Sequence, residues 1–299
     1  GEKNMSHFSV LYIGDLDKLE EAMLPYHEYE CTGIEQYIQE VDETAEFIEN
    51  HKEHPEKSAF EFAEYYYDIS SSDIIYSNQT LDELEDGKYY YLILNEDGSI
   101  NKFVRRTNPN KKWDWWVIGG RWKGAFLGKD GEYHSSIRKG DIDIEKMLQN
   151  ATDDAIKEYD EVYQTFVDVI GETYSKDIEE YASWDKCRTE LFTNNIEAAR
   201  DFYHEQPLVR AIKVFNNKHN YFGNDVDKYL VDKETFIHNC KLKTFSFFAC
   251  LKDNTWYQRG DMGWFACVSN EDDSWDQKIN ELFFEASDDE YVTCVDCHI

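Results

Sequence analysis

The sequence predicts an α+β protein in which β-rich N-terminal and C-terminal parts flank a helical middle that projects as an arm. Residues 7–13 (HFSVLYI) and 291–299 (YVTCVDCHI) are apolar and rich in β-branched and aromatic side chains, which predicts a strand at each end of the chain. Between these ends, apolar residues recur every three or four positions from Met147 to Phe166. That spacing is typical of one face of a long helix.

The N-terminal α+β part is expected to span residues 5–140, because Gly1 to Asn4 precede Met5 and look like a non-native remnant. It begins with the strand at 7–13 and a short helix, capped by Asp15 or Asp17 and stopped by Pro25. An acidic helical insertion is expected at 28–86. The remaining predicted elements of this part are helices at 34–47 and 59–67, a loop at 70–73, hairpin strands at 88–95 and 100–106, a turn at 108–110, and a strand near 125–127.

The helical arm is expected over residues 141–207, with Gly171 ending or kinking its first helix. More helix is predicted over 175–203, ending at Pro207. The C-terminal α+β part then spans 208–299. Its predicted elements are a strand at 208–215, a hairpin of 244–251 with 256–268, a helix over 275–286, and the final strand.

Composition excludes several classes of protein. The 299 residues include 8 Trp, 21 Tyr and 18 Phe, which is incompatible with a disordered tail. No apolar run reaches the ~18 residues that span a bilayer. The seven cysteines are an odd number and widely spaced, which favours reduced thiols in a cytosol. No phosphate-binding loop, dinucleotide fingerprint or hydrolase motif is found, so a catalytic role is not expected.

The chain is strongly acidic, with 62 Asp and Glu against 31 Lys and Arg and a formal net charge of -31. This charge repels nucleic acid and anionic lipid, so neither is expected as a direct partner. It suits a basic partner, such as the DNA-binding groove of another protein. It is also compatible with simple solubility.

The segment from Trp113 to Lys123 is the strongest local feature. Its basic and aromatic side chains interleave, and Gly119-Gly120 permits a sharp turn or a close approach of another segment. The candidate patch for a partner or ligand is Trp113, Asp114, Trp115, Arg121, Trp122 and Lys123, with Asp114 and Arg121 expected to pair. The basic residues around it are Lys102, Arg105, Arg106, Lys111 and Lys112. Two interpretations are open: a stacking-plus-phosphate site, or a structural corner whose cations pair with surrounding acids.

Cys294, Cys297 and His298 form a candidate metal site. The two cysteines have the two-residue spacing of zinc ligands, and Cys240, Cys250, Cys267 or His238 would complete the set. Against this, residues 294 and 297 of one strand point to opposite faces. Residues 294–298 (CVDCH) also match a motif for covalent haem attachment, which is rejected because that chemistry belongs to exported proteins. A structural zinc ion is therefore the one cofactor considered.

Three segments resemble a family of phage and prophage proteins. They are the start Met5-Ser6-His7-Phe8-Ser9-Val10, the centre from Asn108 through Trp113-Asp114-Trp115 to Ile118-Gly119-Gly120-Arg121-Trp122, and the end Val295-Asp296-Cys297-His298-Ile299. Met262-Gly263-Trp264 fits as well. Within that family, the chain is similar in length and acidity to the Gabija anti-defence proteins of Bacillus phages. The segments 28–86 and 144–240 carry no shared motif.

The resemblance implies a non-enzymatic inhibitor in the cytoplasm of an infected bacterium. Such a protein binds the Gabija complex, whose A subunit is a DNA-nicking nuclease with an ATPase domain, and oligomerises around it to block DNA access and cleavage. It also implies an extended shape of several subdomains. No catalytic residue is carried over. For the contacts of such an inhibitor, exposed aromatic residues are expected; the candidates are Tyr65, Tyr66, Tyr67, Phe283 and Phe284.

Two other functions remain open from the residues. One is a nucleotide-binding protein or enzyme that uses the Trp113–Lys123 patch, with Asp296, Cys297 and His298 nearby if the last strand returns to the same sheet. The other is an acidic DNA mimic aimed at a different nuclease, which predicts binding that weakens steeply as salt rises.

Overall fold

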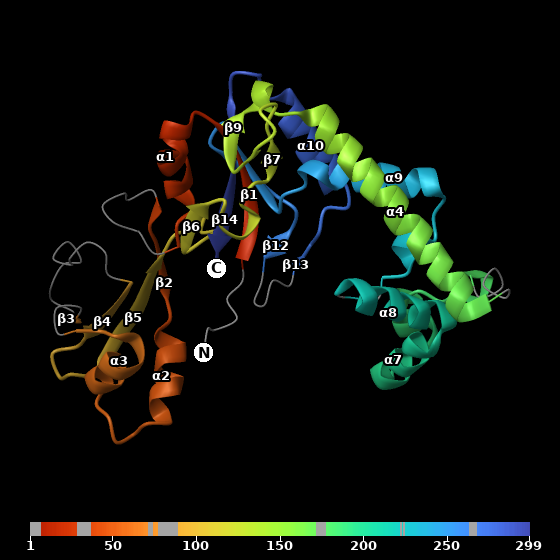
Figure 1. Ribbon diagram of the computed structural model, residues 1–299. Helices are drawn as coiled ribbons and strands as arrows, with labels where there is room; N and C mark the ends of the chain where they lie inside the picture. The colour runs from red at the N-terminus through yellow and green to blue at the C-terminus, as the bar shows by residue number, and fades with distance from the viewer. Residues whose placement is uncertain are drawn as a thin grey trace.

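The computed structural model describes residues 7–28, 37–70, 74–76, 89–171, 178–221, 223, 225–262 and 268–299. Figure 1 shows an arc of three parts: a central mixed sheet, a smaller sheet on one side, and a helical unit on the other side that is reached along the long helix α4. Each part has its own buried apolar cluster. The α+β fold with a helical middle, as predicted, is confirmed.

The central sheet joins the two ends of the chain. Strand β1 (His7–Gly14) pairs antiparallel with β14 (Tyr291–His298) along its whole length, from His7 opposite His298 to Gly14 opposite Tyr291. The sheet order is β11-β10-β1-β14-β6, and β9 pairs with β14 beyond the end of β6. The bounds of the other four strands are β6 Trp115–Ile118, β9 Ser136–Arg138, β10 Ala249–Lys252 and β11 Thr255–Gln258. The N-terminal and C-terminal parts therefore share one sheet.

Both faces of the central sheet are covered, because side chains alternate along each strand. On one face, Leu11 and Cys294 pack with Trp275 and Phe283 of α10 (Trp275–Glu285). On the other face, Phe8 and Cys297 pack with residues of α1 (Leu19–Met23) and with Trp113. The near-continuous apolar runs of β1 and β14 follow from burial on both faces.

Short elements connect and flank the central sheet. The predicted hairpin around Asp253 and Asn254 is confirmed by the pairing of β10 with β11. Both turn residues have positive φ, as a type I′ hairpin turn requires. Pro25 does not stop the first helix outright, since it lies inside the 3₁₀ turn that follows α1. The remaining elements are η1 (Leu16–Lys18), η2 (Leu24–Tyr26), η6 (Gly120–Trp122), β7 (Phe126–Leu127), β8 (Tyr133–His134), η7 (Lys139–Asp141), η11 (Lys243–Phe245), β12 (Asp261–Met262) and β13 (Val268–Ser269).

The smaller sheet has the order β2-β5-β4-β3 and is covered by two helices. Its strands are β2 (Gln39–Asp42), β3 (Ile74–Tyr76), β4 (Tyr90–Leu94) and β5 (Ile100–Thr107), and its helices are α2 (Thr44–Lys52) and α3 (Ala59–Tyr67). The predicted hairpin and the helix at 59–67 are confirmed. The helix predicted over 34–47 is wrong at 39–42, because those residues pair with the edge of β5 and tertiary pairing overrides their helical pattern.

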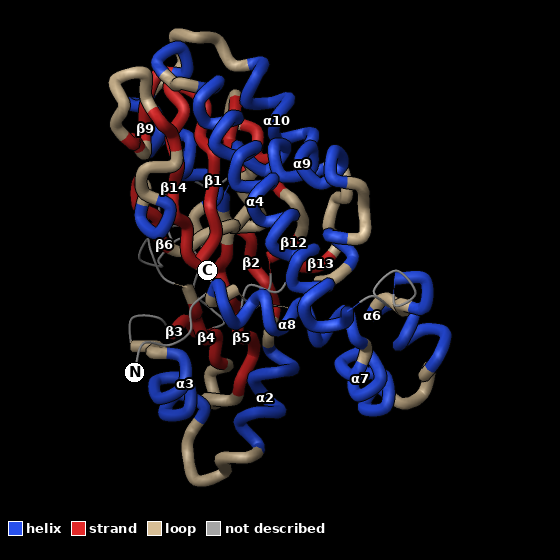
Figure 2. The backbone as a smooth tube through the Cα atoms, turned by 45° about the vertical axis from the view of Figure 1, so that its right-hand side comes forward, coloured by secondary structure: helices blue, strands red, loops and turns tan. Residues whose placement is uncertain are grey.

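The helical unit is built around α4 (Ile144–Ile170), which Figure 2 shows running away from the central sheet. Met147 and Leu148, near its start, pack on the central core, whereas Val162 and Phe166 lie in the helical core. The helix ends before Gly171, which has φ +80°. The remaining elements are α6 (Trp184–Lys186), the π-helical turn η9 (Cys187–Leu191), α7 (Ile196–Glu205), α8 (Pro207–His219), η10 (Asp227–Tyr229) and α9 (Lys233–Leu242).

The strand predicted at 208–215 is wrong. Pro207 begins α8 instead of ending a helix, since its fixed φ and missing N–H suit the first helical turn. Leu208, Ile212 and Phe215 are buried at helical spacing against α4. The boundary expected at residue 208 therefore falls inside the helical core, and the arm continues through α9. The continuous helix predicted over 175–203 is broken at 181–183 and at 192–195, and its first residues lie outside the described ones.

Among the described residues, no helix is both long and apolar enough to cross a bilayer.

Candidate functional site

Three segments far apart in the sequence meet at one end of the central sheet. The β14 strand lies between β1 and β6, so His298 stands opposite His7 on one side and opposite Trp115 on the other. The three rings are in contact: His298 stacks on Trp115 with centroids 5.4 Å apart and planes at 12°, and His7 meets His298 edge-on at 5.1 Å. These residues come from the start, the centre and the end segments described above.

Each histidine is held by a carboxylate at Nδ1. His298 Nδ1 lies 2.5 Å from Asp114 Oδ1, and His7 Nδ1 lies 2.8 Å from Asp296 Oδ1. An ionised carboxylate only accepts hydrogen bonds, so both Nδ1 atoms carry the proton. Nε2 of His298 is buried and has no hydrogen-bond partner in the described part of the chain. We call His7, Asp114, Trp115, Asp296 and His298 the His–Asp cluster.

Asp296 also explains the glycine pair. Its second oxygen accepts a hydrogen bond of 2.9 Å from the main-chain N–H of Arg121, just after the turn. Gly119 and Gly120 have φ +77° and +48°. A Cβ on Gly120 would lie 2.3 Å from Asp296 Oδ2. The sharp turn and close approach predicted from Gly119-Gly120 are therefore both present.

The predicted pairing of Asp114 with Arg121 is wrong. Asp114 reaches across to the imidazole of His298, and Arg121 uses its main-chain N–H, not its side chain, to contact Asp296. This arrangement could not be predicted from local sequence, because both partners, His298 and Asp296, belong to the last strand. His298 is 184 positions away from Asp114. His7 was missed for the same reason. Its only signal was its place as the first residue of a predicted apolar strand, and its pairing with the last strand appears only in the structure.

The tryptophans of the predicted patch divide between the core and the surface. Trp113 is buried with Phe8 and Cys297 on one face of the sheet, and Trp122 is half-buried against the core of the other face. Both tryptophans therefore contribute to the core of the fold and not to a binding surface. Trp115 is 42% exposed, and its strand β6 is the edge of the sheet among the described strands.

Most of the basic residues around the patch are neutralised by acids. Lys102 pairs with Asp42, Arg105 with Glu43, Arg106 with Glu40, and Lys111 with Glu28. Burial lowers the pKa of Lys112. For the four paired residues the structure therefore agrees with cations that pair with surrounding acids, and Lys112 is partly buried. Arg121 and Lys123 are exposed, and neither has an ion-pair partner within the described residues.

The candidate metal ligands are not brought together. Cys294 packs in the core on one face of the central sheet and Cys297 in the core on the other. Burial raises the pKa of the Cys294 thiol to about 12 and that of Cys297 well above its usual value, which opposes the thiolate form that binds metals. Cys267 lies outside the described residues. In the described part of the chain, no three His, Cys, Asp or Glu side chains are placed to hold a metal ion.

The candidate interface aromatics also divide. Tyr65 is 72% and Tyr66 47% exposed on α3, and Phe284 is 46% exposed on α10. Tyr67 is half-buried against the core of the smaller sheet. Phe283 is fully buried in the central core, so its expected exposure is wrong; it stacks on Phe245 at 4.1 Å.

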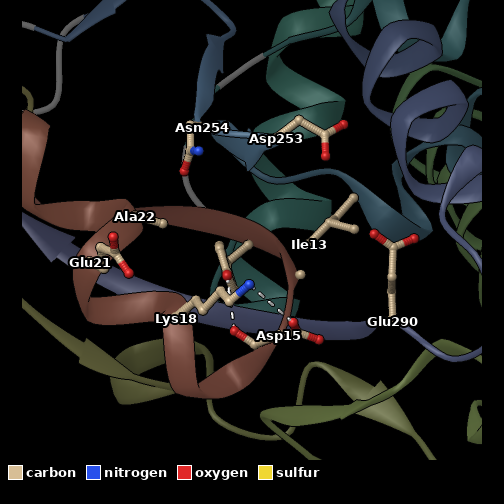
Figure 3. Close-up of a pocket in the computed structure, with 10 residues that line it drawn as sticks. Ile13, Asp15, Lys18, Glu21, Ala22, Asp253, Asn254 and Glu290 are labelled. Carbon is tan, nitrogen blue, oxygen red and sulfur yellow. Dashed lines mark hydrogen bonds and ion pairs between the residues drawn. The ribbon is translucent and has the colours of Figure 1, made fainter.

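A cavity of about 380 Å³ lies at the opposite end of β1 from the His–Asp cluster. Figure 3 shows its lining: the carboxylates of Asp15, Glu21, Asp253 and Glu290 surround it, and the ammonium group of Lys18 points toward Asp15. The Lys18 Nζ to Asp15 Oδ2 distance is 3.6 Å, and both side chains are largely exposed. The excess of carboxylates makes this cavity unsuitable for a phosphate or another anion.

Comparisons of the chain with protein-family models, with curated proteins and with solved structures gave no match.

Proposed function

We propose that this protein is a phage-encoded inhibitor that binds a bacterial defence nuclease, the Gabija complex, and blocks its access to DNA. It acts in the cytoplasm of the infected host and self-associates around its target. The proposal rests on the resemblance of the three segments given above. It is supported by the net charge of -31, which complements the basic DNA-binding surface of a nuclease.

The observation that favours a binding protein most is the placement of the helical unit. The α4 helix carries a second apolar core away from the central sheet. That unit exposes apolar side chains on its surface, and Figure 1 shows it well separated from α3, which exposes aromatic residues. The exposed apolar residues of the helical unit are Val167, Val169, Leu191, Ile196, Phe202, Val214 and Tyr221. Contacts spread over an extended molecule suit the wrapping of a large partner.

The test is a mass determination of the protein, alone and mixed with the Gabija complex, by size exclusion with light scattering. A stable co-complex of defined stoichiometry is expected. Val214→Glu on α8 and Tyr65→Glu on α3 change exposed residues of the two outlying parts, and the variant that loses the complex identifies the covered surface. A monomer that forms no complex would rule out this function.

Salt dependence separates this inhibitor from a pure DNA mimic. A mimic relies on charge, so its complex weakens steeply as ionic strength rises. An inhibitor anchored by apolar contacts loses association rate with salt and keeps most of its affinity. We expect the co-complex to persist at about 0.5 M salt, where the Debye length falls to roughly 4 Å.

A further inference from the structure

Trp115 presents an aromatic surface that is both exposed and fixed. It is 42% exposed, yet His298 stacks on it and the ring of His7 meets it edge-on with centroids 5.3 Å apart. Asp114 and Asp296 hold those two histidine rings in turn. An aromatic side chain that is already ordered loses little conformational entropy when a flat ligand stacks on it.

The main chain that carries two further cations, Arg121 and Lys123, passes close to this surface. The His7 ring links Trp115 to Asp296, and Asp296 accepts the main-chain N–H of Arg121. The main chain of Arg121 is therefore connected to Trp115 through two side chains, Asp296 and His7. Lys123 lies two residues further along the chain. Both side chains are exposed and have no ion pair within the described residues, whereas four cations that come earlier in the sequence, Lys102, Arg105, Arg106 and Lys111, are paired.

The two nearest carboxylates form no ion pair with these cations in the described part of the chain. Asp114 and Asp296 accept hydrogen bonds from His298 and His7, and Asp296 is only 2% exposed. In a chain with a net charge of -31, the pair Arg121 and Lys123 beside an open indole is a local exception. A ligand that combines a flat aromatic ring with a phosphate matches it.

We propose that Trp115, Arg121 and Lys123 bind a nucleotide, with its base stacked on the indole and its phosphates held by the two cations. A single nucleotide fits better than a polymer, because two cations suffice for its phosphates while the acidic remainder of the surface repels a polyanion. This site is additional to the inhibitor function and does not depend on it.

The test measures binding of a fluorescent ATP analogue by anisotropy, with unlabelled ATP as competitor and a labelled dT12 oligonucleotide in a parallel arm. The variants are Trp115→Ala, Trp115→Tyr, and Arg121→Ala combined with Lys123→Ala. Tyr65→Ala and Arg188→Ala are matched controls, since they remove an exposed aromatic and an exposed cation from other parts of the chain.

Wild type and both controls are expected to bind equally. Trp115→Ala weakens binding by roughly 5- to 150-fold, the loss of one stacked base, and Trp115→Tyr retains most of it. The double variant also weakens binding of the ATP analogue, and what binding remains depends less on salt, because the attraction between the cations and the phosphates is lost. Tighter binding of dT12 than of ATP would overturn the assignment of a single nucleotide as the ligand.

The proposal is overturned if wild type binds neither probe at a concentration of about 1 mM, which already allows for weak affinity. It is also overturned if Trp115→Ala binds as well as Tyr65→Ala. Circular dichroism of each variant confirms that the fold is retained. Because no nuclease is present, failure here leaves the inhibitor function standing.

Discussion

Nδ1 of His298 lies 2.5 Å from Oδ1 of Asp114, a contact between residues 184 positions apart in the sequence. It ties the last strand to the centre of the chain, while the pair His7 and Asp296 ties the first strand to the last. The two ends and the middle of the chain are thereby joined at one end of the central sheet. This polar junction fixes the position of Trp115.

Removing the charge of Asp296 is expected to destabilise the central sheet. Asp296→Asn keeps the side-chain volume, but an amide cannot accept from both His7 Nδ1 and the N–H of Arg121 through two oxygens. A buried group left without its partner costs about 1–3 kcal/mol of unfolding free energy. Chemical denaturation measures the loss. Asp201→Asn, at an exposed position of α7, is the control and should leave stability unchanged.

Gly120→Ala should destabilise the protein more than Gly98→Ala. Both glycines have positive φ, +48° and +81°, so each substitution carries a conformational cost of roughly 1–2 kcal/mol. A Cβ on Gly98 meets nothing within 4 Å, whereas one on Gly120 meets Asp296 at 2.3 Å. The difference between the two variants isolates the clash with Asp296. Equal midpoints of unfolding would contradict the close approach.

The thiols of the central sheet should be inert at neutral pH. Burial raises the pKa of Cys250 and of Cys294 to about 12. At pH 8 only about one such thiol in ten thousand is ionised, and the thiolate is the reactive form. Mass spectrometry after brief alkylation should therefore find these two unmodified in the native protein and modified in denaturant. Cys240, half-buried on α9, should react faster. Native labelling of Cys294 at the rate of Cys240 would refute the burial.

The first turn of α3 should be sensitive to acid. Glu61 accepts the main-chain N–H and the hydroxyl of Ser58, and these bonds lower the pKa of Glu61 below its ordinary value of 4.5. A carboxyl with a lowered folded-state pKa stabilises the fold above its unfolded pKa, and this contribution is lost as pH falls through the folded value. Glu61→Gln should thus be less stable than wild type at pH 7, and the difference should shrink as pH falls below 4.5. A difference in stability that does not shrink on acidification would disprove the capping role.

Much of the architecture was predictable because local patterns and tertiary structure agree. The helix at 59–67 begins after Ser58, which accepts the N–H of Glu61 in a capping box, and the helix from Ile144 is buried along the face that its period predicts. Segment 208–215 was misassigned because its β-branched residues favour a strand locally. The segment forms a helix because Ile212 and Phe215 pack against α4, and this tertiary packing outweighs the local preference.

The candidate site was only partly predictable. The interleaved Trp and basic residues marked the region, and the two glycines marked a turn. Which side chain is buried depends on strand register: β14 places Cys297 opposite Trp116 and His298 opposite Trp115. Pairings such as His7 with Asp296 depend on long-range strand order, which local sequence does not encode.

The most direct test of the central claim is a DNA-nicking assay with the Gabija complex and increasing amounts of this protein. The inhibitor function predicts that nicking of a plasmid substrate stops once the protein reaches the stoichiometry of the co-complex, and that DNA no longer binds the nuclease. Nicking that continues unchanged in a several-fold excess of folded protein would contradict it.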